Sequence, residues 1–300
     1  MSHFTVLVIG DAPEAQLAPF QENNMGDCPR EYMEFTDTED EMRGEYETEA
    51  TGAVRMPDGT IVHAYDDRFM VEETDDKSPF PRRVKKIPDD LTEEEIPNKE
   101  MYATFEAYVR EAHGHKARDP EKKRYGYWEN PNCKWDWYVL GGRYTGMFML
   151  KPGATSGSVG ETGVFGTPPR PGMVDRCQVK DIDWDATLGD VRAQRREYWK
   201  ETEAKRKKAE EMNEDPKQVA GYLDMVFGVK PDDTEETYVA RAYIGTFAVL
   251  KDGTWYERGQ MGWWGVVIDE TDHDEWMKKW WELVTGLDGE TWVHVYDCHI

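Results

Sequence analysis

The chain has 300 residues, enough for one large domain or two smaller ones. Its 37 Lys and Arg residues against 61 Asp and Glu residues give a net charge of −24 at pH 7, which argues against direct binding of a nucleic-acid backbone. No segment approaches the roughly 20 consecutive apolar residues that a membrane-spanning helix needs. We therefore expect a soluble, cytoplasmic protein with no membrane partner.

Aromatic residues make up 12% of the chain, which favours a folded protein over a disordered one. All twelve tryptophans lie between Trp128 and Trp292, so the C-terminal part is expected to hold the densest core or a stacking surface. The cysteines contain no CxxC pair, and we expect unpaired thiols and no structural zinc site. These cysteines are Cys28, Cys133, Cys177 and Cys298.

The N-terminal part of the chain begins with a compact apolar run, residues 3–10 (HFTVLVIG), that predicts a buried strand. Residues 74–100 are rich in proline and charged side chains and predict an exposed, flexible or inserted segment. Between these two segments, residues 53–65 predict a hairpin that turns at Pro57-Asp58-Gly59. After them, residues 105–113 predict a helix capped by Thr104.

The C-terminal part alternates strands with helices. The Gly/Ser/Thr/Pro-rich residues 152–172 predict a mobile lid or flexible segment, and residues 187–213 predict a long, exposed, charged helix. Further strands are expected at 240–250, 254–258, 261–268 and 291–300, with a helix at 275–284. Antiparallel hairpins predict a single α+β domain over 1–300, with helices packed on one face of a mostly antiparallel sheet.

The segment WDWYVLGGR is a candidate binding site. On a strand, Trp135 and Trp137 share one face, and the Gly141-Gly142 pair allows a ligand to approach the backbone. Arg143 offers a planar fork for phosphate or carboxylate, so an indole platform beside it could hold a nucleotide. A tryptophan-rich hairpin of purely structural role is the alternative. The predicted ligand contacts are Trp135, Trp137, Gly141, Gly142, Arg143, Trp263 and Trp264.

The last strand carries a candidate catalytic pair. Alternation places Asp297 and His299 on one face, where the carboxylate could orient the imidazole as a general base. Asp66 and Asp67 are further candidates, if His3 in the first strand lies beside the last strand. A strand that only closes the sheet explains the same residues. No metal-binding motif is present, and we expect neither a metal nor another cofactor.

Several strings occur together in an unusual order: MSHFTVLVIG at 1–10, YDDRF at 65–69, NPNCKWDWYVLGGRYTG at 130–146, GTFAVLKDGTWYERGQMGWWG at 245–265 and DCHI at 297–300. Together they resemble a family of uncharacterised proteins encoded by tailed bacteriophages and related bacterial genomes. The resemblance implies an accessory protein that acts inside an infected bacterial cell and counters host defence or alters host metabolism. It carries no known activity or catalytic residues.

Three functions remain open from the sequence. The first is a phage protein that binds a nucleotide-like small molecule or a host defence protein. The second is a nucleotide hydrolase or phosphodiesterase that uses the candidate catalytic residues. The third is an acidic DNA mimic, since a strongly negative chain could imitate the charge of DNA. Exposed tryptophans also predict a homo-oligomer.

Overall fold

The computed structural model describes residues 2–74, 80–114, 116–216, 221, 228–230, 232–262 and 266–300. Contacts within the chain divide it into two compact units. Residues Met1–Met33 and Asn130–Ile300 form the large unit, and Glu34–Glu129 form the small unit. The expected single domain thus differs from the observed organisation, because the chain leaves the large unit after residue 33 and returns to it at residue 130.

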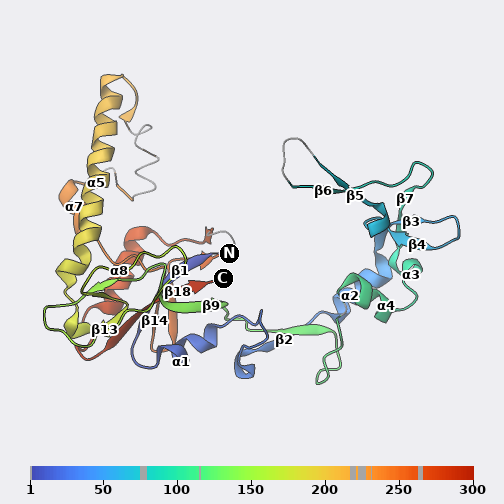
Figure 1. The fold of residues 1–300 in the computed structure, drawn as a ribbon, viewed down its shortest axis with the longest axis horizontal. Helices are drawn as coiled ribbons and strands as arrows, with labels where there is room; N and C mark the ends of the chain where they lie inside the picture. Colours follow the sequence, from blue (N-terminus) through green and yellow to red (C-terminus); the bar gives the residue numbers. More distant parts are fainter. Residues whose placement is uncertain are drawn as a thin grey trace. The chain divides into compact units, whose positions relative to one another are not determined.

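The large unit is built on a seven-stranded sheet with the order β11-β9-β18-β1-β14-β15, with β13 also pairing with β18. The first strand β1 lies between β18, with which it pairs antiparallel, and β14, with which it pairs parallel. Figure 1 shows the chain ends meeting at β1 and β18. The strands are β1 (His3–Ile9), β9 (Trp137–Gly142), β11 (Glu161–Thr162), β13 (Arg176–Gln178), β14 (Ala248–Lys251), β15 (Thr254–Glu257) and β18 (Trp292–His299).

Alternation along β1 and β18 gives the sheet two apolar faces. On one face, Leu7 and Val295 pack against Trp276 and Trp280 of α8 (His273–Val284). On the other, Val6, Tyr296 and Cys298 join a second cluster, to which α1 (Pro13–Leu17) contributes Leu17. In α8 the Asp272 side chain accepts hydrogen bonds from the Asp274 and Glu275 N–H groups and so caps the helix.

The remaining elements of the large unit confirm the α+β class. The helix α5 (Trp184–Glu211) is long and charged, and its buried residues include Leu188 and Arg195. Asp252 and Gly253 form the turn between β14 and β15, and both adopt the positive φ that such a two-residue hairpin turn requires. The other elements are α7 (Glu235–Ala240), β10 (Phe148–Met149), β12 (Met173–Val174), β16 (Gln260–Met261), β17 (Val267–Ile268) and the 3-10 segments Ala18–Phe20, Arg30–Tyr32 and Val179–Asp181.

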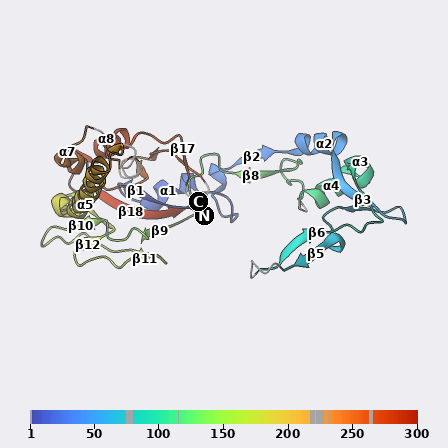
Figure 2. The same cartoon turned by 90° about the horizontal axis from the view of Figure 1, so that it is seen from above.

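The small unit combines hairpins with short helices, and Figure 2 shows α2, α3 and α4 beside β3. Its helices are α2 (Glu39–Thr48), α3 (Asn98–Met101) and α4 (Phe105–Ala112). Thr104 caps α4 through a 3.1 Å hydrogen bond from the Ala107 N–H, as the sequence predicted. The strands are β2 (Glu34–Asp37), β3 (Ala50–Arg55), β4 (Ile61–His63), β5 (Met70–Glu73), β6 (Arg82–Lys85), β7 (Glu93–Pro97) and β8 (Gly126–Glu129), with a 3-10 turn at Asp67–Phe69.

The small unit buries one carboxylate completely. Glu39, 2% exposed, accepts hydrogen bonds from Arg43 (2.7 Å from Nη2) and from the Tyr125 N–H (3.2 Å). Arg118 and Arg124 lie 3.6 and 3.8 Å from the same carboxylate. Burial alone would raise the pKa of Glu39, but these hydrogen bonds and positive charges outweigh it and lower the pKa.

Candidate functional site

Strand register gathers three side chains at one end of the large sheet. His3 of β1 lies opposite His299 of β18, and His299 lies opposite Trp137 of β9. Residues that face one another across neighbouring strands have Cβ atoms about 5 Å apart, so the three side chains form one row. The centroids of the two imidazole rings are 4.9 Å apart, and that of the His3 ring is 6.2 Å from that of the Trp137 ring.

Each histidine of this row is bonded to its own carboxylate. The His3 Nδ1 lies 2.9 Å from Asp297 Oδ1, and the His299 Nδ1 lies 2.6 Å from Asp136 Oδ1. Asp297 sits diagonally across from His3 in the register, within reach of its ring. The structure therefore corrects the expected pairing: Asp297 orients His3, and Asp136 orients His299.

A cavity of about 410 Å³ opens at this end of the sheet. Its lining contains both histidine–carboxylate pairs and is completed by the loop after β11. In the part of the chain that the structure describes, no hydrogen bond reaches the Nε2 atom of either histidine. The lining residues are His3, Asp136, Trp137, Arg143, Gly163, Val164, Asp297 and His299.

The glycine pair at the end of β9 brings Arg143 to the cavity. Gly142 has a φ of +57°, and a Cβ on it would lie 2.4 Å from Asp297, so only glycine fits this approach. The Arg143 N–H then donates a 2.8 Å hydrogen bond to Asp297 Oδ2, while its guanidinium lies over the Phe165 ring at 5.1 Å. The Gly141-Gly142 pair was predicted to let a ligand approach the backbone. In the structure, the group that lies close to Gly142 is the Asp297 side chain of the protein itself.

A buried aspartate fixes the loops around the cavity. Asp175 accepts hydrogen bonds from Thr145 Oγ1 (2.8 Å), the Gly146 N–H (2.5 Å) and the Gly160 N–H (2.8 Å). The segment that follows Arg143 and the segment that leads into β11 are thereby tied to one carboxylate. A Cβ on Gly160 would also lie 2.0 Å from the Leu140 carbonyl oxygen, so this part of the predicted 152–172 lid packs directly on β9. No local sequence pattern points to Asp175 as part of the site.

Two ionisable groups beside the histidines are also perturbed. Burial, followed by the charge of Asp136, raises the pKa of Glu22, and the nearby His299 partly opposes this. Burial and the charge of Asp297 raise the pKa of Tyr144, whose hydroxyl donates to the His3 carbonyl oxygen at 3.1 Å. In both cases the partial burial of the group at this end of the sheet is the main cause of the shift.

Several predicted site residues lie elsewhere. Trp135 precedes β9, is 4% exposed and donates from Nε1 to the Leu17 carbonyl oxygen, so it belongs to the core. Asp66 and Asp67 are in the small unit: Asp66 bonds to Arg68, and Asp67 pairs with Arg83. Trp263 and Trp264 lie outside the described residues. Among the residues that are described, no group of three or more His, Cys, Asp or Glu side chains could hold a metal ion. Cys28, Cys177 and Cys298 are free thiols.

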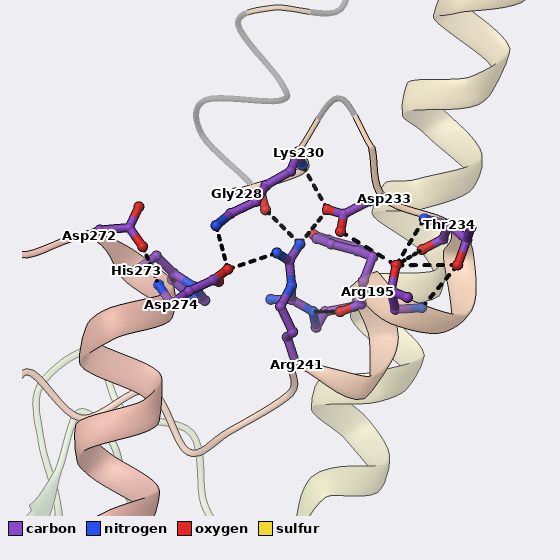
Figure 3. A network of polar contacts seen from close by, with 11 residues as sticks. Arg195, Gly228, Lys230, Asp233, Thr234, Arg241, Asp272, His273 and Asp274 are labelled. Carbon is purple, nitrogen blue, oxygen red and sulfur yellow. Dashed lines mark hydrogen bonds and ion pairs between the residues drawn. The ribbon is translucent and has the colours of Figure 1, made fainter.

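A second polar cluster joins α5, α7 and α8 (Figure 3). Arg241 forms ion pairs with Asp233 and Asp274, and Asp274 also pairs with Lys230. Arg195 donates from Nε to the Tyr238 carbonyl oxygen at 2.8 Å, and its guanidinium lies 3.9 Å from the Tyr238 ring centroid. Paired charges thus connect the end of α7 to α8, and the Arg195 hydrogen bond connects α5 to α7, which suits a structural role.

Comparison of the chain with protein-family models, with curated proteins and with solved structures gives no match in any of the three. Within the ranges that the structure covers, no helix is both long enough and apolar enough to cross a bilayer. The function must therefore be argued from the geometry of the cavity.

Proposed function

We propose that the large unit is a hydrolase or phosphodiesterase that acts on a nucleotide-like phosphate ester through the His3 and His299 pair. One observation carries the proposal: two imidazoles, each bound through Nδ1 to a carboxylate, lie 4.9 Å apart in a cavity that also contains Arg143. A carboxylate on Nδ1 fixes the tautomer and orients Nε2 for proton transfer. Paired acid and base groups of this kind suit the cleavage of an ester.

The proposed reaction needs one histidine neutral and the other protonated. The neutral imidazole takes a proton from the attacking water or hydroxyl as its oxygen bonds to phosphorus. The protonated imidazole gives its proton to the leaving oxygen as the second phosphorus–oxygen bond breaks. Arg143 faces the cavity and would stabilise the negative charge on the remaining phosphate oxygens.

Binding without turnover is the second candidate. Trp137 is 50% exposed although it lines the cavity, and it shares that cavity with Arg143, a combination suited to holding a base and a phosphate. A protein with this cavity could sequester a nucleotide that a host defence system uses. The phage resemblance favours either role inside an infected bacterial cell.

The test is hydrolysis of bis(4-nitrophenyl) phosphate, an activated phosphodiester. We expect His3→Ala and His299→Ala each to lower kcat/KM by about 10²- to 10⁴-fold, the usual contribution of a general acid or base. The double variant should lose little more, because the two groups act as a unit. The wild-type pH profile should be bell-shaped.

The matched control is His63→Ala, which removes an exposed histidine of the small unit and should leave turnover unchanged. Absence of turnover in the wild-type protein, with a nucleotide still bound in calorimetry, would reject the enzyme and leave the binding role.

A further inference from the structure

The charge of the cavity limits the substrates it can accept. Among the lining residues that the structure describes, Arg143 alone carries a permanent positive charge, whereas Asp136 and Asp297 carry two negative charges. With one histidine protonated, as the proposed reaction requires, these charges balance. A ligand with several negative charges would face two carboxylates, with only the guanidinium and that one imidazolium to compensate it. A phosphodiester carries a single negative charge, whereas a terminal phosphate carries about −1.5 to −2 at pH 7.

The rim of the same cavity is apolar and exposed. Trp137 and Val164 line it and are 50% and 91% exposed, and Phe165, beneath the Arg143 guanidinium, is 78% exposed. Large apolar side chains gathered around a charged group are typical of a binding site rather than of ordinary surface. An indole next to a guanidinium can stack a flat, neutral ring while the arginine holds its phosphate.

From this charge balance and this rim we infer that the substrate is a nucleoside phosphodiester with a single negative charge, and that nucleoside di- and triphosphates are rejected. The inference rests on the proposed function and names the substrate class of the same site. The cavity volume of about 410 Å³ lies within the range of small-molecule sites, about 300–1,000 Å³. Cyclic mononucleotides and dinucleoside monophosphates share this chemistry.

The experiment compares kcat/KM for a panel of substrates with the full-length protein. The panel holds 2′,3′- and 3′,5′-cyclic nucleotides, dinucleoside monophosphates, ADP, ATP and methyl 4-nitrophenyl phosphate. We expect at least one nucleoside phosphodiester to exceed ATP and ADP by a factor of 100 or more. Equal or faster turnover of ATP or ADP would overturn the inference, and so would cleavage of methyl 4-nitrophenyl phosphate alone. Either result leaves the proposed function standing. No turnover of any substrate would reject both.

Substitutions at two positions of the rim test the reasons behind the selectivity. Val164→Lys adds a second cation at an exposed lining position and should raise kcat/KM for ATP relative to the phosphodiester, whereas Val164→Gln should not. Trp137→Ala should lower kcat/KM for the nucleoside phosphodiester by about 5- to 150-fold, the range given by base stacking. Trp137→Phe should restore most of it. Unchanged selectivity in Val164→Lys, or an equal loss in Trp137→Phe and Trp137→Ala, would overturn the inference.

Discussion

The two units each bury a carboxylate, but they surround it with different partners. In the small unit, Glu39 is compensated by the guanidinium groups of Arg43, Arg118 and Arg124. In the large unit, Asp297, 1% exposed, meets an imidazole and the backbone N–H of Arg143. Both carboxylates are satisfied, but the first by arginine side chains and the second by an imidazole and a backbone N–H group.

The difference separates a structural carboxylate from a functional one. An arginine stays charged at any pH that a folded protein meets, so the Glu39 cluster is suited to fixing α2 against the segment that precedes β8. A histidine changes charge around neutral pH, and its second nitrogen remains available for a ligand. Substitutions at the two carboxylates should therefore have opposite effects on activity and on stability.

The largest expected effect is that of Asp297→Asn on turnover. An amide no longer stabilises the protonated His3 ring or fixes its tautomer, so we expect kcat/KM for the activated phosphodiester to fall by about 10²-fold or more. The change should appear in kcat and in the pH profile, because Asp297 acts through His3. Turnover and pH profile matching those of the wild type would show that Asp297 only ties β18 to β1 and to Arg143.

Glu39→Gln should have the converse effect. Gln cannot balance the surrounding arginines, and we expect the free energy of unfolding of the small unit to fall by about 1–3 kcal/mol. The indole resonance of Trp128 reports this unit, because Trp128 lies in β8 and donates from Nε1 to Asp119 at 2.7 Å. Urea titration followed by NMR measures the change.

The control for this substitution is Glu41→Gln, an exposed position on the same helix. Turnover by the large unit should stay within about twofold of wild type in both variants. A Glu39→Gln protein that unfolds at the wild-type urea concentration would show that the arginine cluster contributes no net stability.

The sequence predicted the parts of the site that depend on local periodicity. Alternation along the last strand placed Asp297 and His299 on one face, and Val295 lies in the core beneath that face as the same pattern requires. The helix α8 and its buried Trp276 and Trp280 follow from a 3.6-residue period and the Asp272 cap. Such signals are contained within a dozen residues of sequence.

The remaining parts depend on register between strands distant in the chain. No local pattern predicts that His3 lies opposite His299. Nor does it predict that Asp297 bonds to His3 and not to His299, two residues further along the same strand. Asp136 precedes β9, which begins at Trp137, so the alternation of the strand does not say where its side chain lies. Its carboxylate reaches His299 from the turn before the strand.

The smallest expected effect is a difference in how the two units respond to acid. Burial lowers the pKa of His294, against its hydrogen bond to the Gly10 carbonyl oxygen, from an ordinary value of 6.5. A histidine that is harder to protonate when folded contributes stability that is lost as the pH falls below about 6.5. The lowered pKa of Glu39 also contributes stability that is lost in acid, but this contribution is lost only as the pH falls below about 4.5.

The large unit should therefore begin to lose stability at a higher pH than the small unit. Urea unfolding between pH 7.5 and 4 measures both, with Trp280 reporting the large unit and Trp128 the small one. His294→Gln should weaken the response of the large unit between pH 7.5 and 5.5, where His273, whose pKa burial also lowers, still contributes, while leaving that of Trp128 unchanged. If the wild type and His294→Gln show the same pH dependence, the buried imidazole does not set the acid sensitivity of this unit. A joint loss of both indole signals at every pH would show that the two units unfold as one.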